Sequence, residues 1–126
     1  MKYLNAKQIQ DVSFPDAPVE HFVATQDNKL VSFISDAFVG TSPTGKWFDD
    51  SKVEINFSDV QVLEEDSNEV SAYAHEYALR EICEFILTDK TLIMRGFSIG
   101  PGLWTEFTFT NPIIKIGYDE GGQNSE

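Results

Sequence analysis

The sequence predicts a mainly β fold, an antiparallel β-sandwich or open barrel of about seven or eight strands with one or two short helices, with α+β as the alternative. Stretches rich in β-branched and aromatic residues recur along the chain, and short polar or Gly/Pro turns separate them. These connections are too short for crossover helices, so neighbouring strands should run antiparallel. Ten Phe, four Tyr and two Trp can supply the core.

The second half of the chain has the clearest pattern, and it predicts a four-strand meander. The strands are expected at residues 82–87, 92–99, 103–110 and 113–118. Turn sequences separate them, namely the polar run 88–91, Gly100-Pro101-Gly102 and Asn111-Pro112. Leu103, Phe107 and Phe109 share one face of the third strand, so the sheet is expected to bury one side.

The first half predicts a hairpin and a further strand. Residues 19–25 and 30–35 read as strands on either side of a turn. A loop is expected at 40–45, followed by a half-exposed strand over 53–57 in which apolar and polar residues alternate. The alternation shifts by one residue at Asp59, which predicts a bulge or a turn there.

Two short helices are expected. Asn5 can cap a helix that runs to Val12, before Pro15 and Pro18 interrupt regular structure. Residues 70–81 fit both a helical stripe and a strand alternation, and we expect a helix. Residues 1–118 should form a single β-rich domain, and the polar, Gly-rich residues 119–126 a disordered tail.

The charge of the chain restricts its partners. It has 21 Asp and Glu against nine Lys and Arg, a net charge of -12. Such a surface repels phosphate backbones and anionic lipid headgroups, so we expect a basic protein as partner, with no nucleic acid and no membrane. The N-terminus lacks the apolar run of a secretion signal, which favours the cytoplasm.

No catalytic or metal-binding set is legible, and we expect no enzymatic activity, no cofactor and no metal. Residues 40–46 have the spacing of a phosphate-binding loop, but Trp47 stands where the motif needs Ser or Thr. His75 begins an H-E-x-x-H pattern, but Leu79 stands in place of the second histidine. Cys83 is the single cysteine, and its apolar strand predicts an inert, buried thiol.

Glu84 and Glu106 lie on strands that are expected to be neighbours, so they are candidates for a pair of acid–base carboxylates. Arg95 falls between them in the meander, and the simpler interpretation is that it neutralises one of them across the strands. The carboxylate pair therefore adds no catalytic residue to the prediction.

Acidic residues are concentrated between Trp47 and Leu79, where the sequence has nine Asp and Glu and one basic residue, Lys52. This stretch holds eight of the twelve net charges, either as a solvated face or as a docking surface that steers a cationic partner. We predict that it is a partner-binding surface with Trp47 as an apolar anchor. Its residues are Trp47, Asp49, Asp50, Glu54, Asp59, Glu64, Glu65, Asp66, Glu69 and Glu76.

Aromatic residues suggest a different class of function. Trp47, Tyr73, Tyr77 and Trp104 could line an open sheet face that binds a small ligand or a carbohydrate, although such residues more often form the core of a small β domain. An uncapped edge strand could also pair with its own copy and form a homodimer.

The chain resembles the small acidic immunity proteins of bacterial toxin and contact-dependent inhibition systems. The resemblance is carried by the size, the charge, the PDAPVEHF sequence at residues 15–22, and the hairpin-rich second half with WTEFTFTNP at residues 104–112. It implies an inhibitor that covers the active surface of a basic nuclease toxin. It identifies no functional residue.

Overall fold

The computed structural model describes residues 1–25, 29–41, 44–65, 67, 69–74, 77–100 and 102–119. Its elements are β1 (Lys2–Tyr3), α1 (Ala6–Gln10), β2 (Val12–Ser13), β3 (Ala17–Thr25), β4 (Leu30–Val39), β5 (Lys46–Asn56), β6 (Asp59–Glu64), β7 (Leu79–Leu87), β8 (Thr91–Ser98), β9 (Trp104–Thr110) and β10 (Ile113–Tyr118). The prediction of a mainly antiparallel β fold is confirmed. The expected tail at 119–126 lies outside the described residues except for Asp119.

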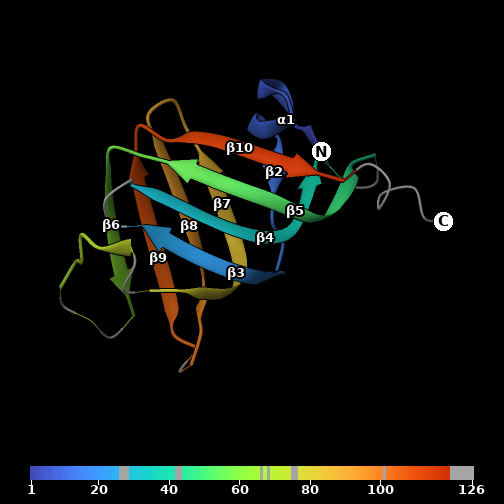
Figure 1. Cartoon of the computed structure of the whole chain (residues 1–126). Coiled ribbons are helices and arrows are strands. Elements are labelled where there is room, and N and C mark those ends of the chain that lie inside the picture. The colour runs from blue at the N-terminus through green and yellow to red at the C-terminus, as the bar shows by residue number, and fades with distance from the viewer. Residues whose placement is uncertain are drawn as a thin grey trace.

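The strands form one ten-stranded sheet in the order β1-β10-β5-β4-β3-β7-β8-β9-β6, with β2 paired to β4. Strand β3 belongs to both parts of this sheet. Its first residues, Ala17 and Pro18, pair with β7, whereas Val19 to Thr25 pair with β4. Figure 1 shows the two parts as layers whose strands cross. The first layer runs from β1 to β3 in this order, and the second runs from β7 to β6. The order begins at β1 and ends at β6, so the sheet is not closed into a barrel.

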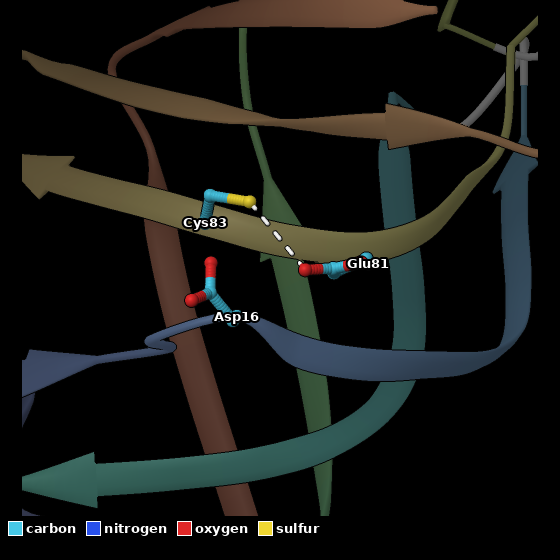
Figure 2. A group of neighbouring side chains, drawn as sticks. All are labelled: Asp16, Glu81 and Cys83. Atoms are coloured by element: carbon cyan, nitrogen blue, oxygen red, sulfur yellow. Dashed lines mark hydrogen bonds between the residues drawn. The ribbon is translucent and has the colours of Figure 1, made fainter. Parts of the chain in front are cut away.

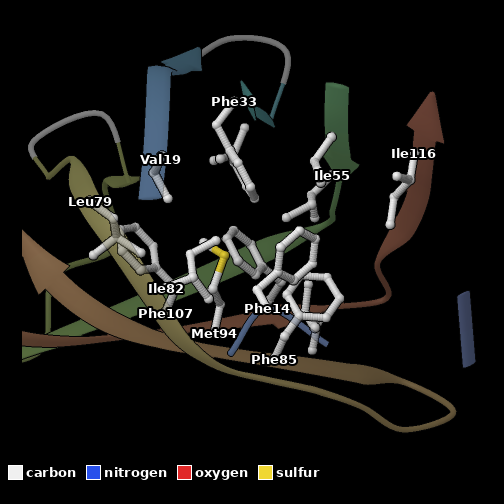
Figure 3. Close-up of a cluster of buried hydrophobic side chains, with 14 of the residues drawn as sticks. Phe14, Val19, Phe33, Ile55, Leu79, Ile82, Phe85, Met94, Phe107 and Ile116 are labelled. Atoms are coloured by element: carbon white, nitrogen blue, oxygen red, sulfur yellow. The ribbon is translucent and has the colours of Figure 1, made fainter. Parts of the chain in front are cut away.

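The core fills the space between the two layers (Figure 3). Phe22 of β3 stacks on Phe33 of β4 with ring centroids 5.9 Å apart, and it also meets Phe107 of β9 at 5.8 Å. Phe14 contacts Phe85 of β7 at 4.9 Å. These rings join the layers, because each pair buries apolar area from both sides.

The predicted four-strand meander is wrong in its last strand. Strands β7, β8 and β9 do follow one another, but β10 leaves them and pairs with β5. Strand β6 occupies the edge of β9 that a fourth meander strand would need. The buried Ile116 of β10 stands opposite the buried Val53 of β5. Strand β10 therefore extends the apolar face of the first layer.

The expected helix at 70–81 is also wrong for the described residues. Ser71 and Val62 exchange two backbone hydrogen bonds of 2.8 and 2.9 Å, and β7 already begins at Leu79. These bonds satisfy the backbone groups of Val62 on the outer edge of β6, and they draw Ser71 into an extended pairing that the helical spacing of the alanines and tyrosines did not indicate.

The helix predicted after Asn5 is confirmed as α1. The Asn5 side chain accepts from the backbone N–H of Gln8, and the Gln8 side chain accepts from the backbone N–H of Asn5, which forms a capping box. The helix is shorter than expected, because Val12 pairs with Val39 in β2.

The shift of alternation at Asp59 is confirmed as a turn between layers. Strand β5 ends at Asn56 and β6 begins at Asp59, while the backbone N–H of Ser58 donates to the carbonyl of Thr110 at 2.9 Å. The turn carries the chain from the first layer to the second, so each side chain changes face.

Candidate functional site

The structure divides the predicted partner-binding residues into two groups. Trp47, Asp49, Asp50 and Glu54 lie on β5 in the first layer, and Asp59 and Glu64 lie on β6 at the far end of the sheet order. Glu65 and Glu69 follow β6, whereas Asp66 and Glu76 fall outside the described residues. The acidic stretch is therefore two surfaces, and we call them the β5 surface and the β6 segment. The β6 segment comprises the described residues between Asp59 and Ala74.

The β5 surface mixes charges of both signs. Lys46 and Lys52 lie on the same strand as its acids, and Lys115 of β10 stands opposite Glu54. Trp47 is 45% exposed, and its ring meets the Phe38 ring at 5.0 Å. This arrangement reduces the field of the β5 surface, because neighbouring opposite charges partly cancel.

The β6 segment combines acidic and apolar exposed residues. Leu63, Val70 and Tyr73 are 41%, 56% and 49% exposed, and they lie among Asp59, Glu64, Glu65 and Glu69. The bridge between Val62 and Ser71 holds the two arms of the segment together. The sequence has no Lys or Arg from Val53 to Leu79, so the segment itself carries no compensating cation.

A pocket of about 160 Å³ opens between the turn after β5 and the second arm of the β6 segment. It is lined by Thr25, Lys29, Phe57, Ser58, Asp59, Val60, Ala72, Tyr73 and Ala74. The Lys29 ammonium group donates to the Ser58 carbonyl at 2.8 Å, which fixes it beside the pocket. This pocket was not predicted, because its walls come from three stretches that lie apart in the sequence. The pairing of Leu30 with Asn56 and the bridge between Val62 and Ser71 bring these stretches together.

The four aromatic residues of the alternative prediction occupy different places. Trp47 contacts Phe38 in the first layer, and Trp104 contacts Phe97 in the second at 5.2 Å. Tyr77 packs against the core, and Tyr73 lines the pocket of the β6 segment. Of the four, Tyr73 is thus the one that lines this pocket.

Arg95 lies between Glu84 and Glu106 on the outer face of β7, β8 and β9. The register pairs Arg95 with both acids, and its guanidinium donates to Glu106 Oε1 at 2.7 Å and to Glu84 Oε1 at 2.5 Å. The hydrogen bonds that Arg95 donates to Glu106 and then to Glu84 raise the pKa of the Arg95 guanidinium further above its usual value. The Arg95 cation therefore binds both carboxylates, so Glu84 and Glu106 lie near each other because each forms an ion pair with Arg95.

Asp16, Glu81 and Cys83 form a cluster that the sequence did not suggest (Figure 2). Their donor atoms all lie within 4.8 Å of one another, and the Cys83 thiol donates to Glu81 Oε2 at 3.8 Å. Ala17 of β3 pairs with Ile82 of β7, so the turn before β3 lies next to β7. This pairing places Asp16 beside Glu81 and Cys83.

The Cys83 thiol is half-buried and not fully buried as predicted. Burial, and then the hydrogen bond and negative charge of the neighbouring carboxylates, raise its pKa from 9.0 to about 12. A thiol with this pKa keeps its proton near neutral pH, so it is a poor nucleophile. Two carboxylates and a thiol are also donor types that bind metals, but here the thiol proton is shared with a carboxylate.

No family model, no curated protein and no solved structure matches this chain. Among the described residues, no helix has the length and apolar character that a membrane crossing requires. The residues 40–46 with phosphate-loop spacing lead into strand β5 rather than the helix that such a loop needs.

Proposed function

We propose that this protein is an acidic protein-binding module that neutralises a basic, nuclease-like toxin by direct binding, as an immunity-type inhibitor does. A nuclease needs a basic surface to hold nucleic acid, and an acidic surface of suitable shape can occupy it. The β6 segment supports this proposal, because it carries exposed apolar residues and acidic residues in one stretch of the chain.

The composition of the β6 segment fits a protein interface. Interfaces have an apolar centre and a polar rim, and a few anchors supply most of the binding free energy. Leu63, Val70 and Tyr73 can provide the centre, and Glu64 and Glu69 the charged rim. Long-range attraction by such a rim raises the association rate of a cationic partner, by roughly 10 to 10³-fold at low salt.

Two double variants with equal changes of net charge test which surface binds. The first carries Glu64→Lys and Glu69→Lys on the β6 segment, and the second carries Asp49→Lys and Glu54→Lys on the β5 surface. Each pair contains one exposed and one half-buried carboxylate, so the pairs are matched for burial as well as charge. Tagged forms are used to capture proteins from host lysate at low and high salt, and bound proteins are identified by mass spectrometry.

We expect one basic protein to bind the wild type and the β5 variant, and to bind the β6 variant at least about tenfold more weakly. High salt should weaken the wild-type complex, and the purified partner should lose its activity on nucleic acid when the complex forms. Equal capture by the β6 variant, or a captured protein that is acidic, would contradict the proposal.

A further inference from the structure

We infer that the pocket of the β6 segment receives one uncharged, apolar side chain of about phenyl size from the basic partner. This inference rests on the proposed function, because it names the anchor by which the partner docks. The size, the wall chemistry and the charges of the pocket all point to such a group.

The volume of the pocket selects a single side chain. Sites for drug-sized molecules usually measure about 300–1,000 Å³, and this pocket has about 160 Å³. An engineered protein cavity of about 150 Å³ binds benzene, so one phenyl ring matches the available space.

The walls of the pocket are mainly apolar. Val60 and Ala74, which are 8% and 5% exposed, are among the residues that line it. Phe57 is half-buried and held by the Phe109 ring, with centroids 4.8 Å apart. Tyr73 is exposed and lines the pocket too, so an entering aromatic ring would meet at least two others in a preformed site.

The charges that line the pocket disfavour a charged occupant. Lys29, held on the Ser58 carbonyl, and Asp59 both line the pocket, and their opposite charges partly cancel. A cationic or anionic side chain would therefore lose its hydration there without a net attraction to replace it. The cations of a basic partner are better placed at the opposite end of the β6 segment, where Glu64, Glu65 and Glu69 lie. The segment therefore has an apolar end with a pocket and an acidic end.

Ala72 gives a direct way to fill the pocket. It is exposed and lines the pocket, so a larger side chain there can occupy the space without entering the core. Ala72→Trp is the main variant, and Ala72→Leu is a second in case the first alters folding. Ala6→Trp is the matched control, because Ala6 is also an exposed alanine and lies in α1.

The test uses the full chain and two synthetic heptapeptides, each with four lysines and two glycines. One peptide has a central phenylalanine and the other a central alanine. Binding is followed by NMR titration at low salt, using the methyl signals of Ala72 and Ala74 to locate the peptide. We expect the phenylalanine peptide to bind about tenfold more tightly and to shift these signals.

The variants separate the pocket from the charge. Ala72→Trp or Ala72→Leu should remove the tenfold preference, and Ala6→Trp should keep it. Glu64→Lys with Glu69→Lys should weaken both peptides alike while the preference stays. If both peptides bind equally and salt-dependently, the pocket inference fails and the acidic docking surface stands. If neither peptide binds in a salt-dependent way, the proposal of an acidic docking surface is wrong. If the phenylalanine peptide also causes no specific shift of the Ala72 and Ala74 signals, the pocket inference is wrong as well.

Discussion

The outer face of β7, β8 and β9 and the β6 segment carry similar numbers of carboxylates but use them differently. On the outer face, Glu84 and Glu106 bind Arg95, and Glu81 accepts from the Cys83 thiol. On the β6 segment, the Glu64 and Glu69 side chains make no hydrogen bond or ion pair with the residues that the structure describes. Strand register decides which carboxylates the fold uses, so a count of charges in the sequence cannot separate the two regions.

The largest expected effect concerns the thiol on the outer face. Raising the Cys83 pKa from 9.0 to about 12 lowers the thiolate fraction about a thousandfold at pH values below 9. A thiolate of higher pKa is also more nucleophilic, here by roughly twentyfold, which offsets part of the loss. Alkylation by iodoacetamide should therefore be about fiftyfold slower in the folded protein than in the protein unfolded in urea. The rate should rise with pH through the alkaline range.

Substitution of the carboxylates sharpens this test. Asp16→Asn and Glu81→Gln should each speed alkylation, because they remove a negative charge beside the sulfur. Asn tolerates the left-handed backbone of Asp16, whose φ is 52°, so the turn should remain. Glu84→Gln is the control, since Glu84 binds Arg95 instead. If the folded protein is alkylated as fast as the unfolded one, the surroundings of Cys83 do not raise the pKa of its thiol.

The next effect is the loss of the cation on the same face. Arg95→Met keeps the aliphatic stem but leaves Glu84 and Glu106 without their partner, so the free energy of unfolding should fall by about 1–2 kcal/mol. Urea denaturation near neutral pH measures this change. In a background with Glu84→Gln and Glu106→Gln, the same substitution should cost less than about 0.5 kcal/mol. An equal loss in both backgrounds would mean that Arg95 acts through packing alone.

The smallest effect is expected on the β6 segment. Glu64→Gln, Glu65→Gln and Glu69→Gln together should change the free energy of unfolding by no more than about 0.5 kcal/mol. The amide at position 65 can still accept from the Trp104 N–H, which the Glu65 carboxylate does at 2.7 Å. The same urea series at low and high salt measures the change. A loss comparable with that of Arg95→Met would place these acids among those that stabilise the fold.

Local signals in the sequence predicted most of the strands and the start of α1. Alternation of apolar residues and the turns at Gly100-Pro101-Gly102 and Asn111-Pro112 located β8, β9 and β10, and the Asn5 cap located the helix. These features depend on neighbouring residues, so a single sequence contains them.

The pairing of distant strands could not be predicted in the same way. The partner of β10 is β5 because of buried side chains such as Ile116 and Val53, which lie far apart in the chain. The cluster of Asp16 with Glu81 and Cys83 depends on the pairing of β3 with β7. The separation of the β5 surface from the β6 segment follows from one turn at Asp59, which the sequence indicated without giving its direction.

The position of β10 between β1 and β5 affects the order in which the protein can fold. Lys2 pairs with Tyr118, and residues 113–117 pair with β5. Strand β1 and the outer edge of β5 can therefore form their pairings only after β10 has been synthesised. Until β10 has left the ribosome, the edge of β5 that pairs with β10 would lack its partner strand. Such sequence-distant pairing slows folding and makes a chaperone useful during synthesis.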